Sequence, residues 1–243
     1  METILAKAEW VETRLRQRGG PRALALAELF AQYAPLVRRV IQQTQRRIFQ
    51  KESVSAADKV VSLFEPHTAI IQRGKAPPKE TEFGRKLWYS EVEGGIISDY
   101  RILDGNPPDA VSWVPSLKYH VKLFGCPPEL ATADRGVFSE TNERFARDLG
   151  VKHVALPQPG AKNRQRKRRE SQRWFKAALR FRTGIEGRIS GLKRARHLDR
   201  CRNRGEQGLE RWVGWGIITN NLVVIATQLA RRHPSKKSRL SSC

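Results

Sequence analysis

The sequence has few cysteines, one methionine and no hydrophobic segment at its N-terminus. Its three cysteines are scattered along the chain at positions 126, 201 and 243. An odd, dispersed set of this kind does not make the disulfide framework of a small secreted domain, and it suits a reducing cytosol. Residues 1–20 begin with charged side chains and lack the apolar stretch of a signal peptide. We therefore expect a soluble, cytoplasmic protein.

Long hydrophobic runs are also scarce. Residues 212–229 approach the length of a membrane span, but the run is interrupted by Thr219, Asn220, Asn221 and Gln228. These polar groups are costly in hydrocarbon, so we expect no membrane span. The alternative is a buried core helix in which the asparagines are hydrogen-bonded, because an unpaired buried amide costs free energy. The side chains expected to pack in that core are Trp212, Trp215, Ile217, Leu222 and Val224.

Acidic residues are outnumbered, with 24 Asp and Glu against 46 Lys and Arg, which gives a formal net charge of +22. Such an excess repels itself in a compact fold and is common where the partner is a polyanion. Nucleic acid is the default partner, because each phosphate that Lys or Arg neutralises releases counterions. A basic protein without such a partner, an RNA-binding protein and a protein on an anionic membrane surface are alternatives that charge alone leaves open.

The chain divides into three parts by composition. Over residues 1–58, apolar side chains recur at helical spacing, which predicts a helical segment. Residues 59–230 mix short apolar strand-like stretches with helical ones, which predicts an α/β core around one mixed sheet flanked by helices. Residues 231–243 are polar and basic, and we expect a disordered tail. 

Within the core, Glu93, Gly94 and Gly95 form a turn signal between two strand-like stretches. Gly150 is a typical helix stop. The segment 158–169 holds two turn formers and many basic residues, which predicts a basic loop. The predicted strands cover 59–64, 84–92, 96–103, 128–134 and 151–156, and the predicted helices cover 110–124, 137–149, 170–200 and 206–232.

Asp134 ends the predicted strand 128–134 and precedes Arg135 and Gly136. Functional side chains of open α/β sheets gather at the carboxyl ends of strands, and an Asp there can hold a divalent cation through hard oxygen ligands. An Asp before an Arg-Gly turn also serves as an ordinary turn residue. Position alone leaves both interpretations open.

Glu186 is one of few acids in a strongly basic stretch. On a helix it shares a face with Arg182, four residues before it, and Lys193 extends that stripe by two turns. By itself this pattern is typical of a surface ion pair worth only a few tenths of a kcal/mol. Together with Asp134, it indicates a site for phosphodiester chemistry, in which converging carboxylates hold two Mg²⁺ ions about 4 Å apart.

Blocks of the sequence from residue 59 to about 225 resemble the catalytic core of DDE-type insertion-sequence transposases. The similarity is greatest to the IS4/IS5-like group and, within it, to the ISNCY-like branch. The resemblance implies a ribonuclease-H-like fold, preceded here by a helical segment. The blocks that carry it are 61–67, 82–86, 94–109, 132–136, 182–194 and 213–222.

The resemblance assigns roles to individual residues. The family's second catalytic Asp lies in an Ala-Asp-x-Gly context, which falls on Asp134. Its third acid lies in a helix with the pattern Tyr, two residues, Arg, three residues, Glu, six residues, Lys. Arg182, Glu186 and Lys193 match this pattern, whereas Leu179 stands in place of the Tyr. The resemblance thus implies Asp134 and Glu186 as catalytic residues and metal ligands.

The family's first catalytic Asp has no counterpart in the expected context. Asp58 follows two alanines and precedes Lys59, unlike the family's Asp, which Thr or Ser follows closely. We therefore expect that residues 1–58 are the tail of an insertion, and that the strand carrying the first Asp lies before the start of this chain. Asp99, Asp104 and Asp109 are weaker candidates for that role, since they match another part of the fold.

The resulting hypothesis is a transposase, truncated at its N-terminus, for Mg²⁺-dependent DNA strand cleavage and transfer. Mg²⁺ or Mn²⁺ is expected only if the metal site is complete. The alternative is a catalytically inactive DNA-binding remnant or regulator. The expected partners are the terminal repeats of the element and target DNA, in the nucleoid-associated cytoplasm, with a homo-oligomer as a further expectation. The residues expected to bind DNA are Arg166, Lys167, Arg168, Arg169, Arg182 and Lys193.

Overall fold

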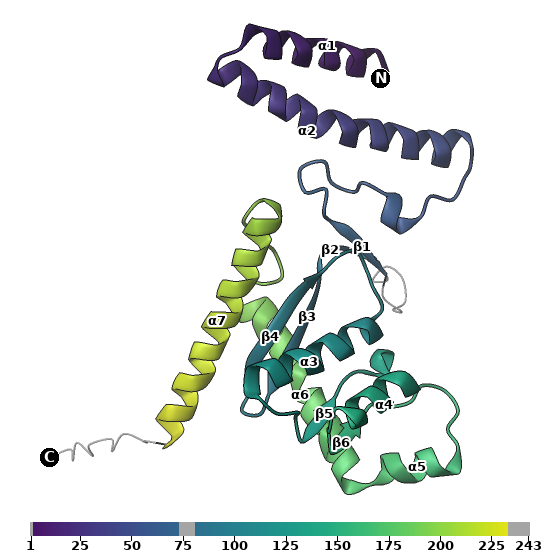
Figure 1. The fold of residues 1–243 in the computed structure, drawn as a ribbon, viewed down its shortest axis with the longest axis vertical. Helices are drawn as coiled ribbons and strands as arrows, with labels where there is room; N and C mark the ends of the chain where they lie inside the picture. The colour runs from purple at the N-terminus through teal and green to yellow at the C-terminus, as the bar shows by residue number, and fades with distance from the viewer. Residues whose placement is uncertain (1, 73–80, 233–243) are drawn as a thin grey trace, which may run out of the picture. The chain divides into compact units, whose positions relative to one another are not determined.

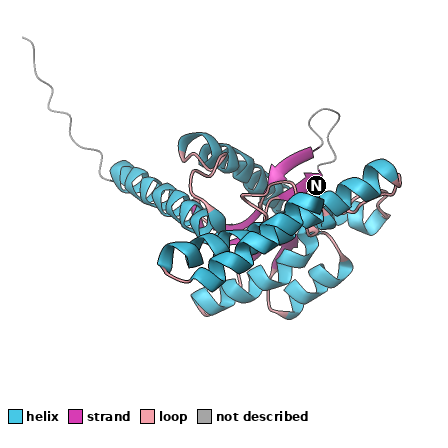
Figure 2. Cartoon of the chain, turned by 90° about the horizontal axis from the view of Figure 1, so that it is seen from above, coloured by secondary structure: helices cyan, strands magenta, loops and turns pink. Residues whose placement is uncertain are grey.

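A computed structural model describes residues 2–72 and 81–232 of the chain. Residues cluster into two compact units, and each is described here by itself. Unit 1 comprises residues 1–86 and 103–106, and unit 2 comprises residues 87–102 and 107–243. Helices predominate, and the strands are short (Figure 2). The mixed α/β class predicted from the sequence is therefore correct.

Unit 1 begins with two long helices, α1 (Glu2–Arg18) and α2 (Pro21–Thr44), which lie side by side (Figure 1). Gly19 and Gly20 reverse the chain between them with φ of 65° and 88°, a region that costs glycine no steric strain. Pro21 then starts α2 at a position where its missing N–H is no loss. The helical segment predicted for this region is thus largely present.

A π-helix, η1 (Gln45–Phe49), and a 3-10 turn, η2 (Ala56–Asp58), lead to the antiparallel pair β1 (Ala69–Gln72) and β2 (Thr81–Gly84). The strand predicted over residues 59–64 is wrong, since no strand forms there. The amide of Gln43 on α2 accepts from the Val60 N–H at 2.9 Å and donates to the Val60 carbonyl at 3.1 Å. A helix side chain therefore satisfies the backbone groups that a neighbouring strand would have paired.

Unit 2 contains most of the hairpin of β3 (Lys86–Val92) and β4 (Ile96–Leu103). A 3-10 turn, η3 (Asp109–Ser112), then leads into α3 (Trp113–Phe124). The indole N–H of Trp88 on β3 donates to the Ser116 hydroxyl on α3 at 2.6 Å. This bond and the apolar packing of Trp88 against Trp113 and its neighbours fasten the hairpin to the helix.

The parallel strands β5 (Leu130–Thr132) and β6 (His153–Ala155) are joined by η4 (Arg135–Val137) and α4 (Glu140–Asp148). Ser139 caps α4 by accepting from the Asn142 N–H at 3.0 Å, as serine commonly does at a helix start. The fully buried side chains of Val137, Ala146 and Leu156 form the core between these elements.

The strands in the described part of the chain pair in three two-stranded sheets, β1–β2, β3–β4 and β5–β6, rather than in the one mixed sheet predicted. In unit 2 the hairpin reaches the β5–β6 pair through side chains: Trp88 packs against the cluster that contains Ala131 and Val154. The sequence pattern identified strand-forming segments, but pairing depends on contacts between distant segments that the pattern does not contain.

The C-terminal part of unit 2 holds three helices, α5 (Arg164–Ser171), α6 (Arg173–Ala195) and α7 (Gly205–Arg232). The basic loop predicted over 158–169 is partly wrong, because a helix begins at Arg164. Asn163 caps this helix by accepting from the Arg166 N–H at 2.8 Å. The predicted tail falls mainly on residues 233–243, which lie outside the described residues.

The helix α7 departs from the buried core helix that was predicted. Trp215 and Leu222 are 67% and 61% exposed, whereas Val213 and Ile217 are buried against Ile97 of the hairpin. Among the described residues, α7 is long and apolar enough to cross a membrane by length and composition alone. Such a finding for a single helix is weak support for a membrane span, because core helices of soluble proteins pass the same test.

Candidate functional site

Asp134 lies at the turn between β5 and η4. Its carboxylate accepts from the Arg135 N–H at 2.8 Å, and its backbone is extended at the start of the 3-10 turn. The side chain is 68% exposed. Asp134 therefore has the local turn role that its sequence context allows, and it also presents an accessible carboxylate just beyond the end of a strand.

Glu186 lies on α6, and its side chain is exposed to a similar extent, at 67%. Arg182, one turn earlier on the same helix, places its Nη1 atom 3.4 Å from Asp134 Oδ1 and 3.7 Å from Glu186 Oε1. One guanidinium group thus bridges two carboxylates that lie far apart in the sequence. The fold brings together the two predicted metal ligands and the Arg that accompanies them.

The third member of the helical pattern, Lys193, lies on α6 two turns beyond Glu186 and is exposed. Seven residues of helix separate the two by roughly 10 Å along the axis. Lys193 is therefore too far along the helix to join the Arg182 cluster, but it extends the same face with a positive charge.

The helix that carries Glu186 is fixed to the hairpin by an ion pair. Arg188 donates to both oxygens of Glu91 on β3, at 2.8 Å from Nε and 2.7 Å from Nη2. The Glu91 side chain is only 3% exposed, and a bidentate pair of this kind fixes orientation as well as distance. Gly95 has a φ of 83°, a conformation that favours glycine, and a Cβ atom there would lie 2.6 Å from the Arg188 guanidinium. The pair sets the register of α6 two residues from Glu186.

Two of the three weaker acid candidates lie in other surroundings, and the third lies near Asp134. Asp99 on β4 is largely buried and lies 3.3 Å from Arg101, whereas Asp104 in unit 1 is exposed and lies 3.4 Å from Arg85. Asp109 begins η3, whose residues contact η4, and its carboxylate lies 3.4 Å from the point that a Cβ on Gly136 would occupy. Asp109 is therefore close to the Asp134 turn.

No group of three or more His, Cys, Asp or Glu side chains in the described ranges is placed to hold a metal ion. Asp134 and Glu186 supply hard carboxylate oxygens, the donor type that Mg²⁺ and Mn²⁺ prefer. They fit two ligands of such a site. The arginine between them shows that the pair already attracts a positive charge.

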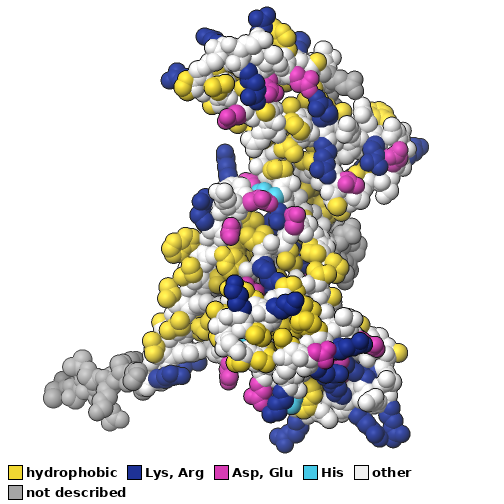
Figure 3. Space-filling view, viewed as in Figure 1, with side chains coloured by type: hydrophobic (Ala, Val, Ile, Leu, Met, Phe, Trp, Pro, Cys, Tyr) yellow, Lys and Arg dark blue, Asp and Glu magenta, His cyan; other side chains and the backbone are white. Residues whose placement is uncertain are grey.

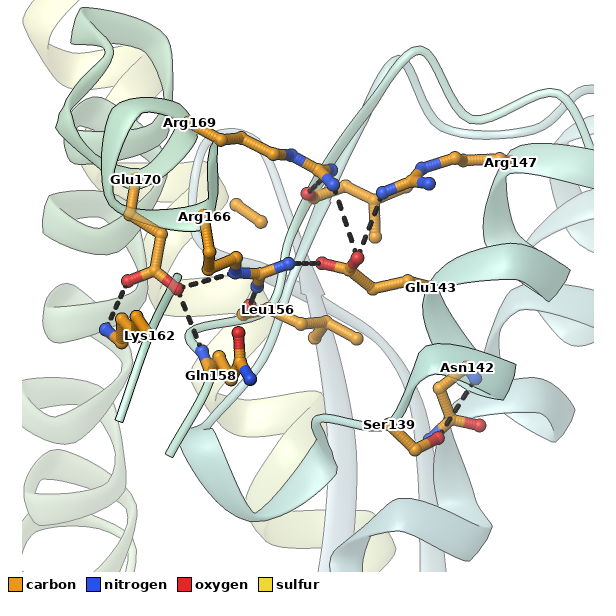
Figure 4. Close-up of polar contacts among 12 residues, drawn as sticks. Ser139, Asn142, Glu143, Arg147, Leu156, Gln158, Lys162, Arg166, Arg169 and Glu170 are labelled. Carbon is orange, nitrogen blue, oxygen red and sulfur yellow. Dashed lines mark hydrogen bonds and ion pairs between the residues drawn. The ribbon is translucent and has the colours of Figure 1, made fainter. Parts of the chain in front are cut away.

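The basic helix α5 contains a buried ion network, which we define as Arg166 with Glu143 of α4 and Glu170 of α5. Arg166 Nη1 lies 2.7 Å from Glu143 Oε1, and Arg166 Nε lies 2.7 Å from Glu170 Oε1 (Figure 4). Its Nη2 atom also donates to the Leu156 carbonyl at the end of β6. All three charged side chains are at most 12% exposed. Arg166 is thus engaged within the fold, in contrast to its predicted place on a DNA-binding loop.

The protonation of this network follows from its contacts. Burial by itself lowers the pKa of Arg166, but the hydrogen bonds that it donates to Glu170 and Glu143 outweigh this effect, and the pKa is raised. For Glu170 burial raises the pKa, whereas the hydrogen bonds from Lys162 and Arg166 lower it by more, so that the net pKa is below its usual value. The contacts within the network therefore favour the charged forms of Arg166 and Glu170.

The other basic residues of α5 differ in their exposure and in their contacts. Arg169 lies between Glu143 and the Val154 carbonyl, at 3.2 Å and 2.8 Å, and burial lowers its pKa. Lys167 and Arg168 are exposed on the opposite side of α5. Figure 3 shows Lys and Arg side chains gathered in this part of the surface. Of the four basic residues predicted to bind DNA in this segment, Lys167 and Arg168 are thus the accessible ones.

Sequence reasoning missed Glu143 and Glu91. Both acids are nearly buried, and each anchors an arginine of a C-terminal helix. The only local sign of Glu143 is its place four residues before Arg147, an ordinary helical pair. Its contact with Arg166 spans 23 residues of sequence, and that of Glu91 with Arg188 spans 97. No local pattern reports contacts at such separations.

Comparison with known proteins adds one finding. Residues 141–226 match the family model of the transposase DDE domain. This match supports a DDE transposase. The matched stretch covers about a third of the chain and includes Arg182 and Glu186, while Asp134 lies just before it. No curated protein and no solved structure matches the chain.

Proposed function

We propose that Asp134 and Glu186 are two of the carboxylates of a transposase active site. The observation that carries this proposal is the Arg182 bridge, which joins a carboxylate at a strand end to one on α6. The match of residues 141–226 to a transposase DDE domain supports the assignment, because it includes the helix that supplies Arg182 and Glu186. DNA is the partner that a transposase domain implies.

Asp134 and Glu186 are the residues that would hold Mg²⁺ or Mn²⁺. When bound, such ions supply an activated nucleophile and stabilise the leaving oxygen of a phosphodiester. Arg182 acts before the cation arrives, because its guanidinium offsets the repulsion between the two carboxylates. With a metal ion held by Asp134 and Glu186, the Arg182 guanidinium would be free to donate to a phosphate oxygen.

The site is proposed to be incomplete in this chain. Two carboxylates fall short of the several that a two-cation site needs, and the described residues hold no group of three potential ligands. We infer that a further carboxylate comes from a segment outside this sequence, as the resemblance to IS4/IS5-like elements, and to their ISNCY-like branch, suggests. The first catalytic strand of a ribonuclease-H-like core would be that segment.

Lys167, Arg168 and Lys193 are proposed to contact DNA phosphates. All three are exposed, and in the part of the chain that the structure describes none of them forms an ion pair with a carboxylate. A net charge of +22 supports association with a polyanion, including the terminal repeats and target DNA of an insertion sequence, in the nucleoid-associated cytoplasm. Contacts of this kind position the DNA without reading its sequence.

The second candidate function is that of a DNA-binding remnant or regulator without catalytic activity. The shortage of carboxylates around Asp134 favours it for this chain in isolation. Both candidate functions use the same DNA-binding surface, and they differ only in whether the protein cleaves DNA.

A cleavage assay on terminal-repeat DNA with Mg²⁺ tests the proposal. The chain alone should bind the DNA, with an affinity that falls steeply as salt rises, and should not cleave it. A version extended upstream by the strand that we propose should cleave, and Asp134→Ala in that version should abolish cleavage. Cleavage by the chain alone that Asp134→Ala removes would contradict the inferred incompleteness, and salt-insensitive binding would contradict the phosphate contacts.

A further inference from the structure

The helix α7 has two unlike faces. One face is fixed to the β3–β4 hairpin: the Asn221 amide accepts from the Ile97 N–H at 3.0 Å and donates to the Ile97 carbonyl at 2.9 Å. Gln228 donates to the Gly94 carbonyl at 2.7 Å, and Ile217 is buried in the same contact. This face of α7 is thus occupied within unit 2.

The neighbouring face is an exposed apolar stripe, here called the α7 stripe. Its members are between 45% and 67% exposed, and they are separated by steps of three, four, three and four residues. That spacing averages 3.5 residues, which is the period of the seam by which two helices pair over several turns. The α7 stripe consists of Trp215, Ile218, Leu222, Ile225 and Leu229.

The distribution of charge along the chain favours one kind of partner for the α7 stripe. The sequence from residue 212 to residue 230 contains no charged side chain, although the whole chain carries a net charge of +22. Two copies of so basic a chain repel each other over most of their surface. The α7 stripe is a place where two copies can approach without bringing like charges together.

We propose that the α7 stripe is a self-association surface, on which a second copy of this chain docks its own α7. The side chains would bury roughly 500 Å² per copy, judged from the area of large apolar side chains and their exposed fractions. Two copies together thus reach about the 1,000 Å² at which specific interfaces begin. Leu222 lies at the middle of the stripe and faces its counterpart whether the two helices run parallel or antiparallel.

A lipid bilayer is a poorer occupant. A span would place the whole circumference of α7 in hydrocarbon, which would break the contacts of Asn221 and Gln228 with the hairpin. The amides would then be left unpaired, at a large cost. A second copy covers only the exposed face and leaves those contacts intact.

Sedimentation velocity on the full chain tests the proposal with a matched pair of variants. Leu222→Lys places a charge at the middle of the α7 stripe, whereas Thr227→Lys places the same charge on an exposed position on another side of the helix. We expect wild type and Thr227→Lys to dimerise with equal affinity, and Leu222→Lys to weaken dimerisation about thirty-fold or more. Circular dichroism of each variant verifies that the helix is retained.

Salt and cross-linking sharpen the test. Because higher salt screens the repulsion between two basic chains, dimerisation should strengthen as salt rises, whereas DNA binding should weaken. In a chain with Cys126, Cys201 and Cys243 replaced by serine, Leu222→Cys should form a disulfide-linked dimer on oxidation, and Thr227→Cys should not. These measurements use neither DNA nor metal, so their outcome is separable from that of the proposed active site.

Three results would overturn the proposal. The first is a wild-type chain that remains monomeric at about 100 μM, far above the dissociation constants of stable interfaces. The second is equal loss of dimerisation in Leu222→Lys and Thr227→Lys. The third is binding of a monomer to vesicles of anionic lipid that Leu222→Lys abolishes, which would assign the stripe to a membrane surface instead.

Discussion

Unit 2 contains two clusters in which an arginine contacts two carboxylates, and the two clusters differ in burial and in contact distance. In the buried ion network, Arg166 touches Glu143 and Glu170 at 2.7 Å, and all three side chains are nearly excluded from water. Around Arg182 the contacts to Asp134 and Glu186 are 3.4 and 3.7 Å, and both carboxylates are about two-thirds exposed. The first cluster has its charges fully engaged within the fold. The second has carboxylates that a ligand can reach.

The comparison indicates a role in stability for the first cluster, and the exposure of the second fits the cation-binding role proposed for it. An ion pair that loses one partner inside the protein leaves an uncompensated buried charge, which is strongly destabilising. An exposed pair at longer distance contributes little, because water and salt screen it. Variants of the two clusters should therefore separate stability from cation binding.

The largest expected effect on stability is that of Glu143→Ala. This change leaves Arg166 buried with one of its two carboxylates missing, and it should lower the free energy of unfolding by about 3 kcal/mol or more. Urea unfolding followed by circular dichroism measures it. Glu129→Ala is the matched control, because Glu129 pairs with Lys152 at 3.1 Å on the surface. The control should change stability by less than about 1 kcal/mol, and equal losses would contradict the structural role of the network.

An intermediate, pH-dependent effect is expected at Glu170. Its pKa in the folded protein is below the usual value, so its contribution to stability is present above the unfolded-state pKa. The contribution is lost as pH falls through the folded-state pKa. Glu170→Gln should therefore be less stable than wild type at neutral pH, and the two stability curves should converge in acid. Parallel curves across this range, from urea unfolding at a series of pH values, would argue against an ionised Glu170 in the network.

The smallest effect on stability is expected at Arg182. Arg182→Ala removes a bridge between two exposed carboxylates and should cost less than about 1 kcal/mol. The same change removes a positive charge from the proposed cation site, so Mn²⁺ should bind several-fold more tightly. Isothermal titration with Mn²⁺ measures this change, and weaker binding in the variant would mean that Arg182 supports rather than opposes the cation.

The sequence predicted the local features well. The hairpin strand 96–103 and its Glu93-Gly94-Gly95 turn were located correctly, since alternation and turn residues are local signals. The long helices α6 and α7 were found by their periodicity, although α6 ends at Ala195 rather than near residue 200. The spacing of Arg182 and Glu186 indicated one helical face, and the structure places both near Asp134.

Features that depend on distant contacts were not predictable. The Gln43 side chain hydrogen-bonds the backbone of Val60, where a strand was expected. Arg166 was expected to contact DNA, but it forms a buried ion pair with Glu143. Likewise, the apolar content of α7 identified a helix but not which face would be covered. In each case the outcome depends on the partner that the fold supplies, and the composition of the segment does not specify that partner.

The most direct test of the central claim is Mn²⁺ binding by the chain, by Asp134→Asn and by a version extended upstream with the carboxylate-bearing strand that we propose. The account predicts weak binding by the chain alone, loss of that binding in Asp134→Asn, and binding at least about ten-fold tighter in the extended version, because each added carboxylate strengthens a hard-cation site. Equal Mn²⁺ affinity in the chain and in Asp134→Asn would contradict the claim that Asp134 is a metal ligand.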